Sequence, residues 1–181
     1  MAVHIAFEKS TDTMLKKLVK ILAGPYVHTE IIVSQADPQI VHTAYSAYMP
    51  TNFSRTLEKD FWFEDLCHDY LSIPVTQDEL MRVSKTCEAC VEAKIPYNLR
   101  DMVLSQVPLR NPSERDLFHT HTLFCSQAVI LILRSCLDGE HPLQPYLAGI
   151  NSRTVTPTQL YELLKPHCVP KCTNQVLCIF H

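Results

Sequence analysis

Apolar positions recur with a helical period in two long segments of this 181-residue chain. The first segment is residues 11–24, TDTMLKKLVKILAG, which Thr11 or Asp12 can cap and Gly24 ends. Its predicted apolar face consists of Met14, Leu15, Leu18, Val19 and Leu22. The second segment is residues 76–95, whose apolar face consists of Leu80, Val83, Cys87 and Cys90 or Val91. Both segments are therefore predicted to be amphipathic helices.

Short segments rich in β-branched and aromatic residues predict strands. Residues 26–34, YVHTEIIVS, and 39–49, QIVHTAYSAYM, flank the turn-like sequence QADPQ, so they are expected to pair as adjacent antiparallel strands. Other predicted strands cover residues 3–7, 61–75 and, as a closing strand, 174–180. Two further helices are predicted over residues 97–107 and 154–165, the latter with Pro157 in its first turn. This order of elements indicates the α+β class.

Composition and charge argue against some classes of function. Hydrophobic residues make up 46% of the chain, its net charge is −3, and no long run of one charge occurs. This argues against a nucleic-acid partner, which favours a clustered basic surface. The single basic group, Lys16, Lys17 and Lys20, is expected to form a solvated helix face. No apolar run approaches the ~20 residues of a membrane helix.

The first ten residues contain no charged leader followed by a long apolar stretch, so we expect no secretory signal. The eight cysteines are then expected to be reduced thiols in a cytoplasmic, reducing compartment. One of them, Cys125, lies just before the apolar run of residues 128–133, which could be a buried strand or a buried helix. Cys125 could be a core thiol, a metal ligand or a nucleophile.

A thiol nucleophile needs a base, a positive environment and donors for an oxyanion. If the apolar run is helical, its N-terminus offers Cys125 free N–H groups and a partial positive charge. His28, in the strand pattern of residues 26–33, is the best candidate base. His42 lies in the next strand pattern, and paired strands would bring it to His28 as an orienting partner.

Metal binding is the competing chemistry. Cys87 and Cys90 have a zinc-knuckle spacing that His119 and His121 could complete, but both cysteines fall on a predicted apolar helix face. Core packing is therefore favoured there. The spacings in the tail fit no tight zinc pattern; its candidate ligands are Cys168, Cys172, Cys178 and His181. We expect neither a metal nor another cofactor.

The order of short motifs resembles the circularly permuted branch of the papain-like, NlpC-type superfamily. That branch includes bacterial YiiX-like proteins, relatives of lecithin:retinol acyltransferase, and poxviral members. The matching segments, in chain order, are YVHTEIIV (26–33), IVHTAY (40–45), KIPYNLRDM (94–102), FCSQAVILIL (124–133) and VTPTQLYELL (155–164). The resemblance implies an antiparallel sheet packed against a buried helix that carries the nucleophilic cysteine at its N-terminus. It spans residues 1–165 as a catalytic domain and leaves residues 166–181 as a cysteine-rich extension with the closing strand.

The resemblance also implies roles for individual residues. Cys125 would be the nucleophile, His28 its base and His42 the third member, although relatives often have an acid in that third position. Tyr97 and Ser126 would lie at the oxyanion and substrate side. The implied activity is that of a cysteine peptidase, amidase or acyltransferase acting on a peptide or lipid acyl group, with peripheral membrane contact compatible with it. The alternatives are a catalytically silent binding module of the same fold and a zinc-stabilised interaction protein.

Overall fold

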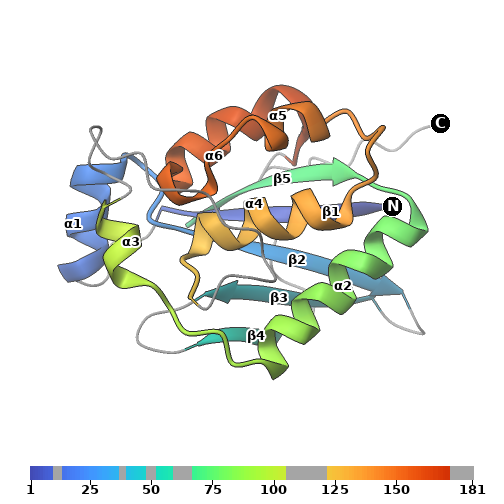
Figure 1. Ribbon diagram of the computed structural model, residues 1–181, viewed down its shortest axis with the longest axis horizontal. Helices are drawn as coiled ribbons and strands as arrows, with labels where there is room; N and C mark the ends of the chain where they lie inside the picture. Colours follow the sequence, from blue (N-terminus) through green and yellow to red (C-terminus); the bar gives the residue numbers. More distant parts are fainter. Residues whose placement is uncertain (10–13, 37–39, 48–51, 59–66, 105–121, 172–181) are drawn as a thin grey trace.

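An antiparallel sheet forms the centre of the computed structural model, which describes residues 1–9, 14–36, 40–47, 52–58, 67–104 and 122–171 (Figure 1). Its six strands lie in the order β4-β3-β2-β1-β5-β6. They are β1 (Ala2–Glu8), β2 (His28–Ala36), β3 (Ile40–Ala47), β4 (Phe53–Glu58), β5 (His68–Pro74) and β6 (Val169–Lys171). The predicted α+β class and the predicted antiparallel pairing of the second and third strands are confirmed.

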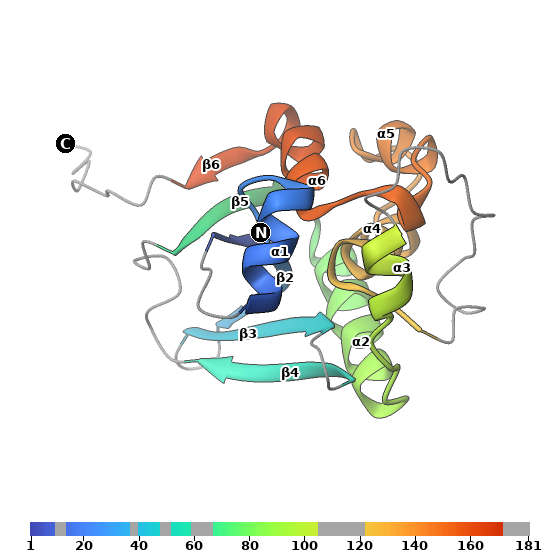
Figure 2. The same cartoon turned by 90° about the vertical axis from the view of Figure 1, so that its left-hand side faces the viewer.

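Helices cover one face of this sheet, as the side view of Figure 2 shows for α2 and α4. The α-helices are α1 (Met14–Ala23), α2 (Gln77–Glu92), α3 (Leu99–Leu104), α4 (Cys125–Cys136), α5 (Gln144–Ala148) and α6 (Pro157–Leu164). Two short 3₁₀ turns follow α5 and α6, namely η2 (Ser152–Thr154) and η3 (Lys165–His167). The helix predicted over residues 76–95 is confirmed as α2, with Leu80, Val83, Cys87 and Cys90 buried.

The core forms around α4, which settles the structure of the apolar run at 128–133. Every residue from Cys125 to Leu133 is buried, because the sheet lies on one side of the helix and α2, α5 and α6 lie around the rest. A helix that is covered all round has no polar stripe, so its sequence shows no helical period. This is why the run looked equally compatible with a buried strand.

Several elements differ from the sequence-based predictions. Met14, expected on the buried face of α1, is 83% exposed. Strand β4 was not predicted, and neither was α5. Residues 61–66 of one predicted strand and the predicted closing strand at 174–180 lie outside the described residues. Within the extension, β6 pairs with β5 at the sheet edge.

The turn between α1 and β2 is fixed by a residue far along the chain. Gly24 has a φ of +94°, and a Cβ there would lie 2.9 Å from the Thr158 hydroxyl oxygen in α6. The same oxygen accepts a hydrogen bond from the Tyr26 backbone N–H, at 3.2 Å. Only glycine combines the left-handed conformation with this close approach. Thr158 therefore sets the direction in which the chain enters β2.

The start of α2 is tied to the end of α4 by one carboxylate. Thr76 and Glu79 form a capping box, and the other oxygen of Glu79 accepts a hydrogen bond from the Asp138 backbone N–H, at 2.9 Å. Burial raises the pKa of Glu79, but the backbone N–H groups of Asp138 and Thr76 outweigh burial and lower it. The charged form of Glu79 thus stabilises the junction of the two helices that cover the sheet.

Replacing Glu79 with Gln should lower the free energy of unfolding at neutral pH by about 2 kcal/mol, because a charge-assisted cap is lost. A carboxyl with a lowered pKa in the folded state stabilises above its unfolded pKa and loses that effect as pH falls. Urea unfolding should therefore show a smaller loss of stability on acidification in Glu79→Gln than in the native chain. Glu92→Gln, at the exposed end of the same helix, is the matched control. Equal acid dependence in all three proteins would contradict this role.

Candidate active site

Cys125 is the first residue of α4 and is only 2% exposed. The chain reaches it through a short parallel bridge between Tyr97 and Leu123. The Leu123 N–H donates to the Pro96 carbonyl at 3.0 Å, and the Asn98 N–H donates to the Leu123 carbonyl at 2.8 Å. The segment around Tyr97 therefore fixes the strand-like approach to the helix and, with it, the position of the thiol.

No side chain caps the start of α4. Its N-cap residue is Phe124, which has no polar side-chain atom, and Gln127 at the third helical position has an Oε1 without a hydrogen-bond partner. In α6 the corresponding Gln159 closes a capping box with Thr156. The first N–H groups of α4 consequently lack the side-chain acceptor that satisfies those of α6. A helix start of this kind favours negative charge next to Cys125.

His28 provides a basic partner for this thiol. It is the first residue of β2 and 6% exposed, and its ring lies next to Cys125. Its Nε2 lies 3.5 Å from Oε1 of Glu30. Burial lowers the pKa of His28, but the hydrogen bond and charge of Cys125, followed by those of Glu30, outweigh burial and raise the pKa above its ordinary value. The ring is therefore stabilised as an imidazolium between two groups that can carry negative charge.

Glu30 completes a line of three side chains with His28 and Cys125. Because alternate residues of a strand point to the same face, Glu30 lies beside His28 two positions earlier. The Ser46 hydroxyl on β3 donates to Glu30 Oε1 at 3.4 Å. Burial raises the pKa of Glu30, but the hydrogen bond and charge of His28 lower it overall. Glu30 is thus held as a carboxylate that can orient the imidazole.

Tyr97 lies near the thiol, in the segment that pairs with Leu123. Its side chain packs against Val27, Met102 and Phe124, and the segment is held by Asn98, whose Nδ2 donates to the Thr122 hydroxyl at 2.7 Å. Burial, and then the negative charge of Cys125, raise the pKa of the Tyr97 hydroxyl above its ordinary value. The hydroxyl therefore keeps its proton and can act as a hydrogen-bond donor.

His42 does not join this group, and the expectation that it orients His28 has to be corrected. In the register of β2 and β3, His42 lies opposite Ser34, and its Nδ1 is 2.8 Å from the Ser34 hydroxyl. His28 is six residues earlier on β2, a separation of roughly 20 Å along an extended strand. Glu30, and not His42, is the residue that lies beside His28. Two ionisable residues at i and i+2, His28 and Glu30, were the sequence signal for it.

Ser126 also differs from its expected role at the substrate side. Its side chain is fully buried, and its hydroxyl donates to the Val155 carbonyl at 2.6 Å. The hydroxyl proton is therefore used in a hydrogen bond that joins α4 to the segment before α6. Ser126 therefore anchors the helix and does not offer its side chain to a ligand.

Two of the other cysteines, Cys87 and Cys90, belong to the hydrophobic core. The six cysteines among the described residues are free thiols, and Cys87 and Cys90 are buried on the apolar face of α2, as predicted. Burial raises the pKa of both thiols. His119, His121 and the tail residues Cys172, Cys178 and His181, considered as metal ligands above, lie outside the described residues.

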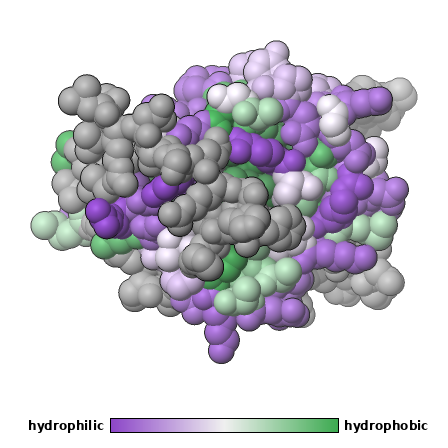
Figure 3. Space-filling model, viewed as in Figure 1, coloured by the Kyte–Doolittle hydropathy of each residue, from purple (hydrophilic) through white to green (hydrophobic). Residues whose placement is uncertain are grey.

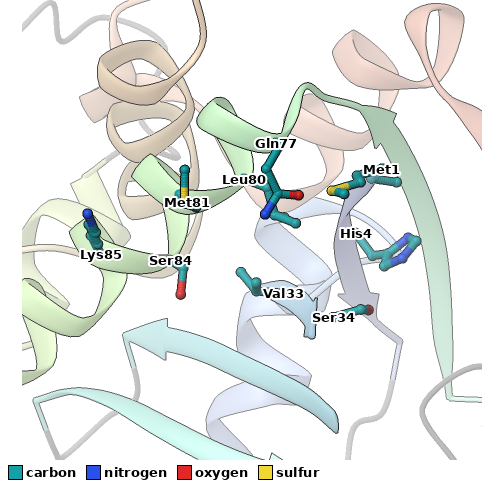
Figure 4. A pocket seen from close by; sticks show the side chains of 10 residues that line it. Met1, His4, Val33, Ser34, Gln77, Leu80, Met81, Ser84 and Lys85 are labelled. Atoms are coloured by element: carbon teal, nitrogen blue, oxygen red, sulfur yellow. The ribbon is translucent and has the colours of Figure 1, made fainter. Parts of the chain in front are cut away.

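A cavity of about 710 Å³ lies away from these residues (Figure 4). It is formed where the beginning of β1 and the later part of β2 face the first turns of α2, and Leu80, Val33 and Met1 line it. None of the side chains around Cys125 lines this cavity. The cavity is therefore separate from the candidate site at the start of α4.

Comparison with solved structures finds the same fold in a bacterial protein. The chain superposes on the crystal structure of the metalloprotein YiiX from Escherichia coli O157:H7 with a TM-score of 0.59 and 14% sequence identity. The match covers 96% of this chain and 97% of YiiX. No family model and no curated protein matches the sequence. The chain therefore has a YiiX-like fold, an α+β arrangement with an antiparallel sheet, over nearly its whole length.

The line of Cys125, His28 and Glu30 can be tested by thiol labelling. At neutral pH, Cys125 should react with iodoacetamide faster than the exposed Cys67, because His28 can act as its base and the uncapped helix start offers free N–H groups. Glu30→Gln should slow the labelling of Cys125 about tenfold, whereas His42→Ala should leave it unchanged. Peptide mapping after brief exposure measures both rates. A larger effect of His42→Ala than of Glu30→Gln would contradict the assignment of Glu30.

Proposed function

We propose that this protein is a thiol-dependent hydrolase or acyltransferase that acts on an amide or ester bond. The observation that carries the proposal is the buried line of Cys125, His28 and Glu30 at an uncapped helix start. This combination supplies a nucleophile, a base and an orienting carboxylate, the three parts of a thiol triad. It supports a cysteine peptidase or amidase, or an acyltransferase, with a permuted papain-like arrangement of the catalytic residues.

In the first half of the reaction, His28 holds the proton of Cys125 and the thiolate sulfur attacks the substrate carbonyl carbon. A carbon–sulfur bond forms, and the carbonyl π electrons move to the oxygen. The His28 imidazolium then gives its proton to the departing amine or alcohol as the carbon–nitrogen or carbon–oxygen bond breaks. Glu30 remains a carboxylate throughout and keeps the imidazole in the orientation that both proton transfers need. The product of this half is a thioester on Cys125.

In the second half, water or another acceptor gives a proton to His28 and attacks the thioester carbonyl. The carbon–sulfur bond breaks, and the proton returns to the sulfur. In both halves the negative oxygen is stabilised by the backbone N–H of Cys125 and the Tyr97 hydroxyl. Both donors are expected to need little reorganisation when the charge develops, because Cys125 begins α4 and Tyr97 is held by its bridge to Leu123.

A catalytically silent binding module of the same fold is the second candidate. The observation that favours it is the burial of Cys125 and His28, since a reacting carbonyl must reach the sulfur. A silent module would keep the fold and bind a ligand without converting it. The native chain would then show no turnover for Cys125→Ala to abolish. The two candidates therefore separate on turnover, independently of binding.

Turnover of amide, ester and lipid acyl probes by the purified chain tests the proposal. Cys125→Ala should abolish turnover, and His28→Ala should lower kcat at least 1,000-fold, because nucleophile and base act as a unit. Tyr97→Phe should lower kcat about 10- to 100-fold with little change in KM, as expected when a donor acts only in the transition state. His42→Ala is the matched histidine control and should retain native turnover. Turnover that remains in the Cys125→Ala variant would contradict the proposal.

The resemblance to YiiX, which is described as a metalloprotein, raises the question of a metal in this chain. Among the described residues, no three or more His, Cys, Asp or Glu side chains are grouped in a way that could hold a metal ion. The residues described here thus do not fit a metal centre, and we derive no step through one.

Turnover and folding should therefore be unaffected by a chelator. We expect the native chain to keep its turnover rate and its melting temperature after incubation with EDTA and gel filtration. Elemental analysis of the same sample measures bound zinc directly. One tightly held zinc equivalent, with loss of the fold on chelation, would replace this account with that of a zinc-stabilised interaction protein.

A further inference from the structure

Helix α1 exposes two large apolar side chains that its sequence pattern does not explain. Met14 is 83% exposed and Ile21 is 81% exposed. They are seven residues apart, so they lie on nearly the same side of the helix, two turns apart. Isolated exposed apolar residues are common on protein surfaces, but these two form a row along one short helix. Packing in the core does not account for the exposure of these two side chains.

Lysines flank this apolar row. Lys17 and Lys20 are exposed on the same helix, and α1 contains no acidic residue. Lys16 is used differently, because its Nζ lies 2.6 Å from the Glu8 carboxylate. The net charge of the chain is −3, so α1 is a local positive surface on an otherwise acidic protein. In the space-filling view, green apolar and purple hydrophilic groups adjoin at the left edge, where α1 lies in Figure 1 (Figure 3).

This surface lies at the end of the sheet that carries the candidate active site. Lys16 of α1 pairs with Glu8, and Glu8 is the direct neighbour of His28 in the register of β1 and β2. His28 in turn contacts Cys125. Figure 2 shows α1 at this end of the sheet, facing the viewer. Whatever binds the exposed side of α1 is therefore held close to His28 and Cys125.

We propose that the exposed side of α1, formed by Met14, Lys17, Lys20 and Ile21, docks the protein on an anionic membrane surface. Interfacial helices combine an apolar row that enters the lipid with lysines that pair with anionic headgroups. No helix within the described ranges is long and apolar enough to cross a membrane. The contact is thus peripheral, and charge complementarity selects an acidic lipid surface as its partner. The inference does not rest on the proposed catalysis.

Vesicle sedimentation with the full chain tests this docking. The chain should bind phosphatidylcholine vesicles that contain about one third phosphatidylserine, and should bind pure phosphatidylcholine vesicles at least tenfold more weakly. Lys17→Gln with Lys20→Gln should weaken binding to the acidic vesicles roughly 25-fold, since each lysine near such a surface contributes about fivefold. Met14→Ser with Ile21→Ser should weaken it at least tenfold. Higher salt should weaken binding of the native chain.

The matched control uses the same residue types on another helix. Met81 and Lys85 are exposed on α2, and Met81→Ser with Lys85→Gln should leave vesicle binding unchanged. Cys125→Ala should bind as the native chain does, which separates docking from catalysis. Equal binding to neutral and acidic vesicles, or no binding to either, would overturn the proposal. So would a dimer in analytical ultracentrifugation that Met14→Ser with Ile21→Ser dissolves, because a second copy would then cover this surface.

Discussion

The burial of α4 is the constraint on which the rest of the structure depends. From Cys125 to Leu133 every residue of this helix is buried, so no side of this stretch can face water. The sheet must cover one side, and α2, α5 and α6 must cover the others. Because packing at this density allows little displacement, the helix is fixed along its length as well as around its axis. The position of its first residue is then a consequence of the core.

At Cys125 the stability of the helix and the proposed reactivity of the thiol have opposite requirements. A side-chain cap would stabilise α4, but it would occupy the N–H groups next to the thiol. A polar N-cap typically stabilises a helix by about 1 kcal/mol, and this chain provides one for both α2 and α6. At α4 the position is taken by Phe124, which contributes apolar packing against Val27 and Met102. Proteins most often lack a stabilising local feature, such as a helix cap, at positions where function needs the polar groups that are left unbonded. The short helix α5 also lacks a side-chain cap, so the start of α4 is distinguished by the cysteine that it places next to His28.

The sequence predicted the elements whose signals are local. Helix α2 has a full apolar period and a capping box, and the strand at residues 26–34 has turn residues beside it. Strand β4 is short and mostly polar, and it forms because β3 offers it an edge, which no local pattern reveals. Helix α5 is a single short turn and is equally dependent on its contact with α4.

Of the candidate site, Cys125 and His28 were predicted from the sequence, whereas Glu30 was missed. Cys125 and His28 stand out by residue type and context, and the structure joins them. The choice of His42 required the register of β2 and β3, which depends on where the turn between them closes. That register places Ser34, and not His28, opposite His42. Pairing within one strand, as in His28 and Glu30, depends only on alternation and could have been found.

The contact of Thr158 with Gly24 and Tyr26 has a consequence for how the protein is made. The turn that leads into His28 is completed by a side chain 132 residues farther along the chain than Tyr26. During synthesis the N-terminal strands leave the ribosome long before α6 exists, and such distant contacts form late and slowly. The nascent chain therefore lacks the hydroxyl that fixes this turn until residue 158 has emerged. Cys125 and His28 therefore reach their final geometry only after α6 has been synthesised.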